Sequence, residues 1–203
     1  TFFKKNLDPE LQKVDAGLFK ISEKNKKIYD VFRNRIIFPI KSHRDQIIGF
    51  GGRVIDPTDN AKYLNSSDSD IFKKGRELYG LSEILKNKKR INRIVVVEGY
   101  TDVLSLFSND MNYAVATLGI ATSKFHIDKL FTHVDEVIFC FDGDDAGVKA
   151  AESALNISLS GLRDGKKIKF MFLPEGEDPS SLLEKEGKEE FENCLLYTSD
   201  AAD

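Results

Sequence analysis

Acidic residues follow three apolar runs in the second half of the chain, where they could hold a divalent cation. The stretch FCFDGDDAG (139–147) places Asp142 and Asp144 directly after the apolar run EVIFC. Glu98 follows the run RIVVV, and Asp178 comes shortly after the run KFMFL. Carboxylates this close repel one another, and without nearby His or Cys they suit a hard cation such as Mg²⁺. Two such cations could hold the attacking and leaving oxygens of a phosphoryl transfer.

The elements that must position these acids alternate between strands and helices. We expect strands at 91–99, 112–119, 135–143 and 166–174, and helices at 101–110, 122–133, 144–162 and 178–195. The alternation predicts βαβ units, and therefore an α/β fold with a parallel sheet covered on both faces. Working groups in such sheets lie beyond the carboxyl ends of the strands. Glu98, Asp142, Asp144 and Asp178 should therefore meet at one edge.

The first half of the chain has a different pattern. RIIFPI (35–40) and QIIGFGGRVI (46–55) read as a strand pair around the turn KSHRD, while residues 1–30 read as loops and short helices. Residues 56–80 carry turn signals and little periodicity, which favours a functional surface. The glycines of GFGGR (49–53) could serve a hairpin turn or let phosphates approach the backbone.

The two halves also differ in charge. Residues 1–90 hold 20 Lys and Arg against 12 Asp and Glu, whereas residues 91–203 hold 10 against 21. A basic half joined to an acidic half hints at nucleic-acid contact, although chance patchiness would look the same. We therefore expect a basic N-terminal subdomain at 1–90. The family resemblance described below implies an α/β domain at 91–178 and the start of a helical region with an atypical tail at 179–203.

Several other classes fit the sequence poorly. DGDDAG begins like a calcium loop, but Ala146 and Ser153 stand where further oxygen ligands are needed. An aspartyl nucleophile would favour a lysine near the end of the last strand, whereas Lys166 and Lys167 lie at its start. No apolar stretch reaches the roughly 20 residues of a membrane span. Two cysteines make neither a disulfide framework nor a zinc site, and the three histidines show no partner pattern, as on a surface or in a satisfied core.

Three motifs carry a family resemblance. VVVEGYTDV (95–103), FDGDDAG (141–147) and PEGEDP (174–179), in this order, resemble a Toprim domain, and more narrowly the RNA-polymerase core of a bacterial DnaG-type primase. RIIFPI, IIGFGGR, KYLNS and DIFKKGRELYGL resemble the segment that precedes Toprim in these primases. The match runs from about residue 28 to about residue 193. It implies a Toprim-type parallel sheet preceded by a smaller α+β basic subdomain.

The resemblance implies a metal site. Glu98, Asp142 and Asp144 would bind the catalytic Mg²⁺ ions, for which Mn²⁺ can substitute, and Asp178 would be a further ligand. Asp102 is an acid of the same family motif and would support the site. Ser180 stands where the family commonly has a second aspartate, which leaves one metal position open.

The resemblance also implies a nucleic-acid and nucleotide groove in the basic half. The residues on family positions that line it are Arg53, Lys62 and Tyr63, with Asn65, Lys74 and Arg76 as neighbours. Lys and Arg would neutralise phosphates, and Tyr63 could stack on a base.

The activity implied is that of a primase, a nucleotidyltransferase that makes short RNA primers on single-stranded DNA from ribonucleoside triphosphates for DNA replication. We expect a monomeric fragment of a longer bacterial, cytoplasmic chain, whose zinc ribbon and C-terminal helicase-binding domain lie outside this sequence. One alternative is a Toprim nuclease or topoisomerase-like enzyme, which cleaves a nucleic-acid strand instead of joining nucleotides. The other is a non-catalytic DNA-binding scaffold.

Overall fold

The structure, a computed structural model, describes residues 17–56, 61–87, 91–161, 164–196 and 199–200. They form two compact units. The first contains the described residues of 1–42 and 46–73, and the second those of 43–45 and 74–203.

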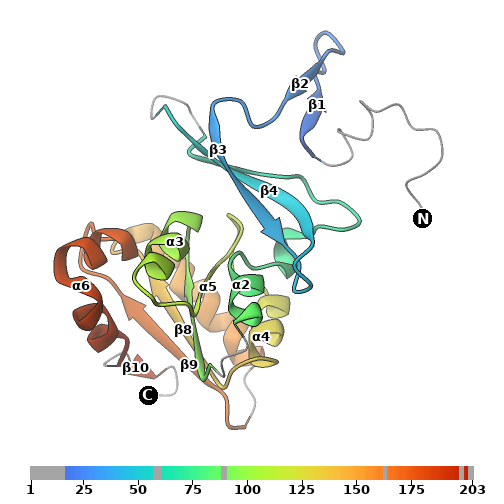
Figure 1. The fold of residues 1–203 in the computed structure, drawn as a ribbon. Coiled ribbons are helices and arrows are strands. Elements are labelled where there is room, and N and C mark those ends of the chain that lie inside the picture. The colour runs from blue at the N-terminus through green and yellow to red at the C-terminus, as the bar shows by residue number, and fades with distance from the viewer. Residues whose placement is uncertain (1–16, 57–60, 88–90, 162–163, 197–198, 201–203) are drawn as a thin grey trace. The chain divides into compact units, whose positions relative to one another are not determined.

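The second unit is built on a five-stranded sheet (Figure 1). Its strands are β6 (Arg93–Val97), β7 (Ala114–Ala116), β8 (Glu136–Phe141), β9 (Lys167–Phe172) and the short β10 (Ser199–Asp200). Their order across the sheet is β10-β9-β8-β6-β7, and all are parallel except β10, which pairs antiparallel with β9. The predicted parallel α/β sheet is confirmed, with β8 and β6 at its centre.

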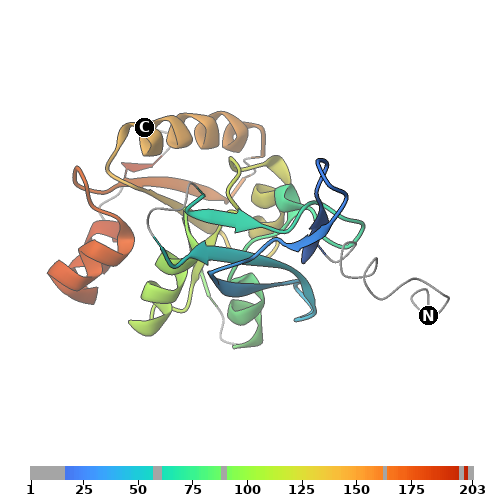
Figure 2. The same ribbon diagram turned by 90° about the horizontal axis from the view of Figure 1, so that it is seen from above.

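Helices cover both faces of this sheet. They are α2 (Leu81–Lys86), α3 (Tyr100–Ser108), α4 (Lys124–Phe131), α5 (Asp145–Gly161) and α6 (Pro179–Leu196), together with the 3-10 turn η1 (Lys74–Arg76). Consecutive strand residues alternate between two cores, so that Ile94 and Val96 join the core under α4 and α5, whereas Val95 and Val97 join the core under α3 and α6. Figure 2 shows α5 along one face and α3 and α6 on the other. Burial on both sides explains why these strands read as continuous apolar runs.

The structure adds detail to two of the expected helices. Ser123 is the N-cap of α4, because its Oγ accepts a hydrogen bond of 3.2 Å from the backbone N–H of His126. The expected helix at 178–195 is two helical segments, because Gly187 interrupts α6 with a φ of 81°. Glycine adopts this left-handed conformation without strain, which is why the break falls there.

The first unit contains antiparallel strands. The expected strand pair is confirmed as β3 (Arg35–Lys41) and β4 (Ile47–Val54), which β5 (Tyr63–Asn65) extends to three strands. The expectation of loops and short helices before residue 30 is wrong for the described part, where β1 (Phe19–Ile21) and β2 (Ile28–Asp30) form a hairpin. Strands of three residues are too short to show an alternating pattern.

The glycines of GFGGR lie inside β4 and not in the hairpin turn. A Cβ built on Gly49 would lie 3.2 Å from the ring of Phe72, and one built on Gly52 would lie 2.7 Å from the ring of Phe32. Phe72 is buried, so the ring packs directly on the strand backbone. These two glycines therefore make room for aromatic rings in the core of the first unit.

Candidate functional site

The predicted acids meet at the carboxyl edge of the parallel sheet. Glu98 follows β6, Asp142 and Asp144 follow β8, and Asp178 lies between β9 and α6. The backbone N–H of Asp142 donates to Glu98 Oε1 at 3.3 Å, which joins the ends of β6 and β8 directly. Asp102 comes from the first turn of α3, one helical turn beyond Glu98.

Glycines allow the backbone to come close around the acids. The backbone N–H of Gly143 donates to Glu177 O, and that of Gly176 donates to Gly143 O, both at 3.1 Å. A Cβ on Gly143 would lie 1.9 Å from Pro174 O, and a Cβ on Gly147 would lie 2.2 Å from Asp142 O. Both positions are thus closed to any side chain, which accounts for the glycines of FDGDDAG.

Two of the aspartates also cap helices. Asp144 Oδ1 accepts the backbone N–H of Gly147 at 2.7 Å, at the start of α5. Asp178 Oδ1 accepts the backbone N–H of Ser181 at 2.7 Å, at the start of α6. The first turn of α3 follows Glu98 at the same edge, so three helix N-termini face the acids. Their partial positive charge offsets some of the repulsion among the carboxylates.

Asp142 is the least compensated of these acids. Its Oδ1 is buried and finds no hydrogen-bond partner among the described residues. The pKa of Asp142 is raised from 3.8 to about 7, mainly by burial and then by the negative charges of Glu98, Asp102, Asp178 and Asp144, in that order. A buried carboxylate oxygen without a donor, surrounded by four other acids, is a place that a cation would stabilise.

Asp102 is buried behind this group. Its Oδ2 accepts the backbone N–H of Gly99 at 2.9 Å, and its Oδ1 accepts the hydroxyl of Ser180 at 3.3 Å. Burial is the main cause that raises its pKa to about 6, with the charges of Asp178 and Glu98 adding to the effect. Ser180, the residue that departs from the family motif, therefore supports Asp102 through a hydrogen bond.

The donor set fits a hydrated hard cation better than a closed cage. Within the described ranges, no group of three or more His, Cys, Asp or Glu side chains is arranged to hold one ion. Asp102 directs both carboxylate oxygens to protein donors, while the caps use one oxygen each of Asp144 and Asp178. Mg²⁺ usually keeps several waters and takes one or two carboxylates, so Asp142 and Glu98 are the residues best placed to hold it.

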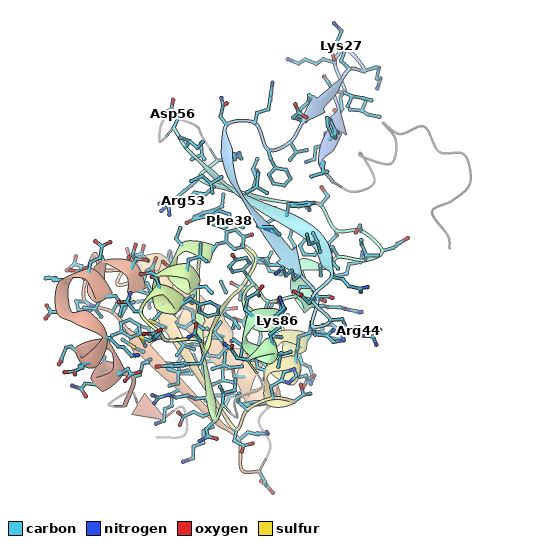
Figure 3. All side chains as sticks on the ribbon, in the orientation of Figure 1. Lys27, Phe38, Arg44, Arg53, Asp56 and Lys86 are labelled. Carbon is cyan, nitrogen blue, oxygen red and sulfur yellow. The ribbon has the colours of Figure 1, made fainter. Side chains whose placement is uncertain are left out.

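The predicted basic residues fall into two groups. In the first unit, Arg53 of β4 pairs across the sheet with Tyr63 of β5, and its guanidinium lies 5.7 Å from the Tyr63 ring centroid. The Lys62 ammonium lies 5.8 Å from the same centroid, and Asn65 ends the same strand. Figure 3 shows the Arg53 side chain projecting from β4. These residues thus form one cation–aromatic cluster.

Lys74 and Arg76 belong to the second unit, in η1, which docks on the N-terminus of α4. His126 is fully buried, and its Nδ1 accepts the backbone N–H of Ser123 at 3.2 Å. Its Nε2 therefore carries the proton and donates to Lys74 O at 3.0 Å. Burial lowers the pKa of His126, in keeping with this neutral form. Of the two places expected for the histidines, a surface or a satisfied core, the structure shows the core for His126. Its partner, 52 residues earlier, left no sequence signal.

None of the helices in the described part of the chain combines the length and the hydropathy that crossing a bilayer requires.

Comparison with known proteins agrees with this geometry. Residues 1–85 match the family model for the N-terminal domain of the DNA primase catalytic core, and residues 95–183 match the Toprim-like model. A DNA primase of Pseudomonas putida is 52% identical over 178 residues, covering 88% of this chain and 27% of the relative. That of Escherichia coli strain K12 is 50% identical over 179 residues, covering 88% and 30%. The chain thus spans about a third or less of these relatives.

Solved structures of the same kind superpose closely. A DNA primase domain from Pseudomonas aeruginosa matches with a TM-score of 0.91 at 47% identity, covering 96% of this chain and 61% of that one. A DnaG primase catalytic domain bound to ssDNA matches with a TM-score of 0.89 at 46% identity, covering 98% and 64%. The motifs, the parallel sheet and these matches lead to one conclusion: the chain belongs to the DnaG primase family and carries part of its catalytic core.

Proposed function

We propose that the acid edge of the second unit joins ribonucleotides into short RNA primers on a single-stranded DNA template. The observation that carries the proposal is Asp142, whose buried, unpartnered carboxylate oxygen lies among four further acids. Such a site matches the need of phosphoryl transfer for a cation beside the reacting phosphate. Mg²⁺, or Mn²⁺ in its place, would lower the pKa of the attacking 3′ hydroxyl and neutralise charge at the α-phosphate.

The residues of this chain supply position. The backbone N–H of Asp142 donates to the Glu98 carboxylate at the ends of two adjacent strands, which keeps the two residues close together. The caps hold Asp144 and Asp178 at the first turns of α5 and α6. Because the supports are backbone N–H groups of strands and helices, little reorganisation is needed when substrate arrives.

The remaining partners follow from the family. The cluster of Arg53, Lys62 and Tyr63 suits phosphates and bases of the template or the nucleotide, since cations neutralise backbone charge and an aromatic ring stacks. A similar catalytic domain was solved bound to ssDNA. We further propose a monomer that works at the bacterial replication fork in the cytoplasm and meets the replicative helicase through another part of the whole protein. The domain limits at residues 90 and 178 stay predictions.

A primer-synthesis assay with labelled ribonucleotides, a single-stranded template and Mg²⁺ or Mn²⁺ tests the proposal. Glu98→Gln and Asp144→Asn remove charge while keeping shape, and an asparagine at 144 can still cap α5. Both should lose synthesis and keep DNA binding. Asp110→Asn is the matched control, because it removes a charge at an exposed position with a φ of 60° that asparagine tolerates.

The outcomes separate the candidate functions. Synthesis by both variants at the rate of the unchanged chain would overturn the site assignment. Nicked DNA in place of RNA products would favour a Toprim nuclease. DNA binding with neither product, repeated in a chain extended to the length of its relatives, would favour a non-catalytic scaffold.

A further inference from the structure

An aromatic side chain stands on the surface of α4 with a cation stacked on it. The side chains of Ile127 and Leu130 on the same helix are fully buried, whereas Phe125 is 55% exposed. A single exposed apolar residue needs no explanation by itself. Here, however, the Arg76 guanidinium lies 4.5 Å from the centroid of the Phe125 ring. An arginine stacked on an exposed ring presents a flat, positively charged surface.

This pair is held in place by the turn that carries Arg76. The Ser123 hydroxyl donates to Gly75 O at 2.5 Å, and His126 donates to Lys74 O at 3.0 Å. The Lys129 ammonium and the Glu77 carboxylate form an ion pair of 2.9 Å beyond the other end of the turn. The backbone on both sides of Arg76 is thus held in place, which restricts its side chain to the region beside the Phe125 ring before any ligand arrives. Preorganisation of this kind lowers the entropy cost of binding.

The pair lies at the same edge of the sheet as the acids. Helix α4 begins just after the loop that follows β7, and Phe125 is its second residue. A hollow of about 300 Å³ extends along this loop, with Glu98 and Ile120 among the residues that line it. Ile120 in turn lies beside the turn, since a Cβ on Gly75 would be 3.7 Å from Ile120 Cδ1. Ile120 therefore lies both beside the turn that carries Arg76 and in the hollow that Glu98 lines.

We propose that Phe125 and Arg76 form a stacking platform for a base of single-stranded DNA on its way to the acid edge. This inference rests on the proposed function and adds a position to it. The ring and the guanidinium offer flat faces that suit any base, while the positive charge suits the neighbouring phosphates. Double-stranded DNA keeps its bases stacked inside the duplex, so only a single strand can use such a platform.

Binding of fluorescent single-stranded DNA, measured by anisotropy with the 203-residue chain, tests the platform. Phe125→Ala should weaken binding about 5- to 30-fold, the range expected when one stacked base is lost at an exposed site. Phe125→Tyr should bind like the unchanged chain, because it keeps the ring. Leu159→Ala is the matched control, since it truncates an apolar side chain of similar exposure (59%) near the end of α5.

A second oligonucleotide of the same length with abasic sites separates stacking from charge. The loss caused by Phe125→Ala should shrink to less than about twofold on this strand, because no base remains to stack. The slope of affinity against salt should stay unchanged in Phe125→Ala, because no phosphate contact is removed.

Two results would overturn the platform while the proposed function stands. One is an equal affinity of Phe125→Ala and the unchanged chain for the normal strand, which would point to a protein partner for this surface. The other is an equal loss on the normal and abasic strands. Failure of the unchanged chain to bind single-stranded DNA would overturn the platform and the proposed function together.

Discussion

Replacing Gly143 with alanine should separate the loops that carry the acids. The built Cβ lies 1.9 Å from Pro174 O, 2.5 Å from Pro174 C and 2.7 Å from Leu173 O, and real Cβ atoms essentially never come closer than 3.0 Å. The two loops must therefore move apart by at least 1.1 Å, the difference between 1.9 and 3.0 Å. Such a shift breaks the two hydrogen bonds between Gly143 and the residues 176–177.

The cost follows from these contacts. Each lost hydrogen bond removes about 1 kcal/mol, and the forced expansion adds about 1–3 kcal/mol, so the free energy of unfolding should fall by about 3–5 kcal/mol. A displacement of about 1 Å between groups that act together lowers a rate by about 100-fold. Primer synthesis should fall by at least that factor even where the variant remains folded.

Urea unfolding followed by tyrosine fluorescence measures the first effect, and the primer-synthesis assay measures the second. Gly165→Ala is the control, because Gly165 has a φ of 79° but nothing within 4 Å of its built Cβ. It should lose only about 1 kcal/mol of stability to backbone strain and keep its activity. A Gly143→Ala chain as stable and active as the unchanged one would refute the reasoning, and so would equal losses in the two variants.

Two further predictions concern buried titratable groups. Because the pKa of Asp142 is about 7 in the folded chain against an ordinary value of 3.8, the unfolded chain loses this proton first as pH rises. Without divalent cations, urea midpoints should therefore fall between about pH 4 and pH 7, and Asp142→Asn should restore about 1–2 kcal/mol at pH 7, a figure reduced for partial exposure. His126→Ala leaves the Ser123 N–H and Lys74 O without their partner. The free energy of urea unfolding should therefore fall by about 2–4 kcal/mol, and DNA binding should weaken because the turn that carries Arg76 is no longer held. Unchanged values for both would contradict the docking described for η1.

The sequence predicts the strand–helix alternation well because local signals carry it. The run at 93–97 is apolar on consecutive positions, as a strand buried on both sides must be. The carboxyl ends of parallel strands then gather Glu98, Asp142 and Asp178 without further information, since topology alone brings them together. Asp102, one turn beyond Glu98, could be placed beside the site only because the family motif that contains Glu98 also contains this acid.

Contacts between distant positions are harder to foresee. Nothing local in the sequence pairs His126 with Lys74 O, or links Ser180 to Asp102, because each contact depends on how helices pack. The glycines of GFGGR show the same limit, since a glycine that admits an aromatic ring looks like one that serves a turn. The platform at Phe125 leaves no signal at all, because an aromatic residue on an amphipathic helix is usually buried.

The docked turn at 74–76 has a consequence for the spacing between the proposed stacking platform and the acids. Arg76 and the acids belong to one compact unit, and hydrogen bonds from Ser123 and His126 fasten the turn to that unit. Any motion of the unit that contains Arg53 and Tyr63 leaves the span from Phe125 to Glu98 unchanged. For the proposed platform, the number of nucleotides between the stacked base and the reacting end is therefore set by distances within one compact unit.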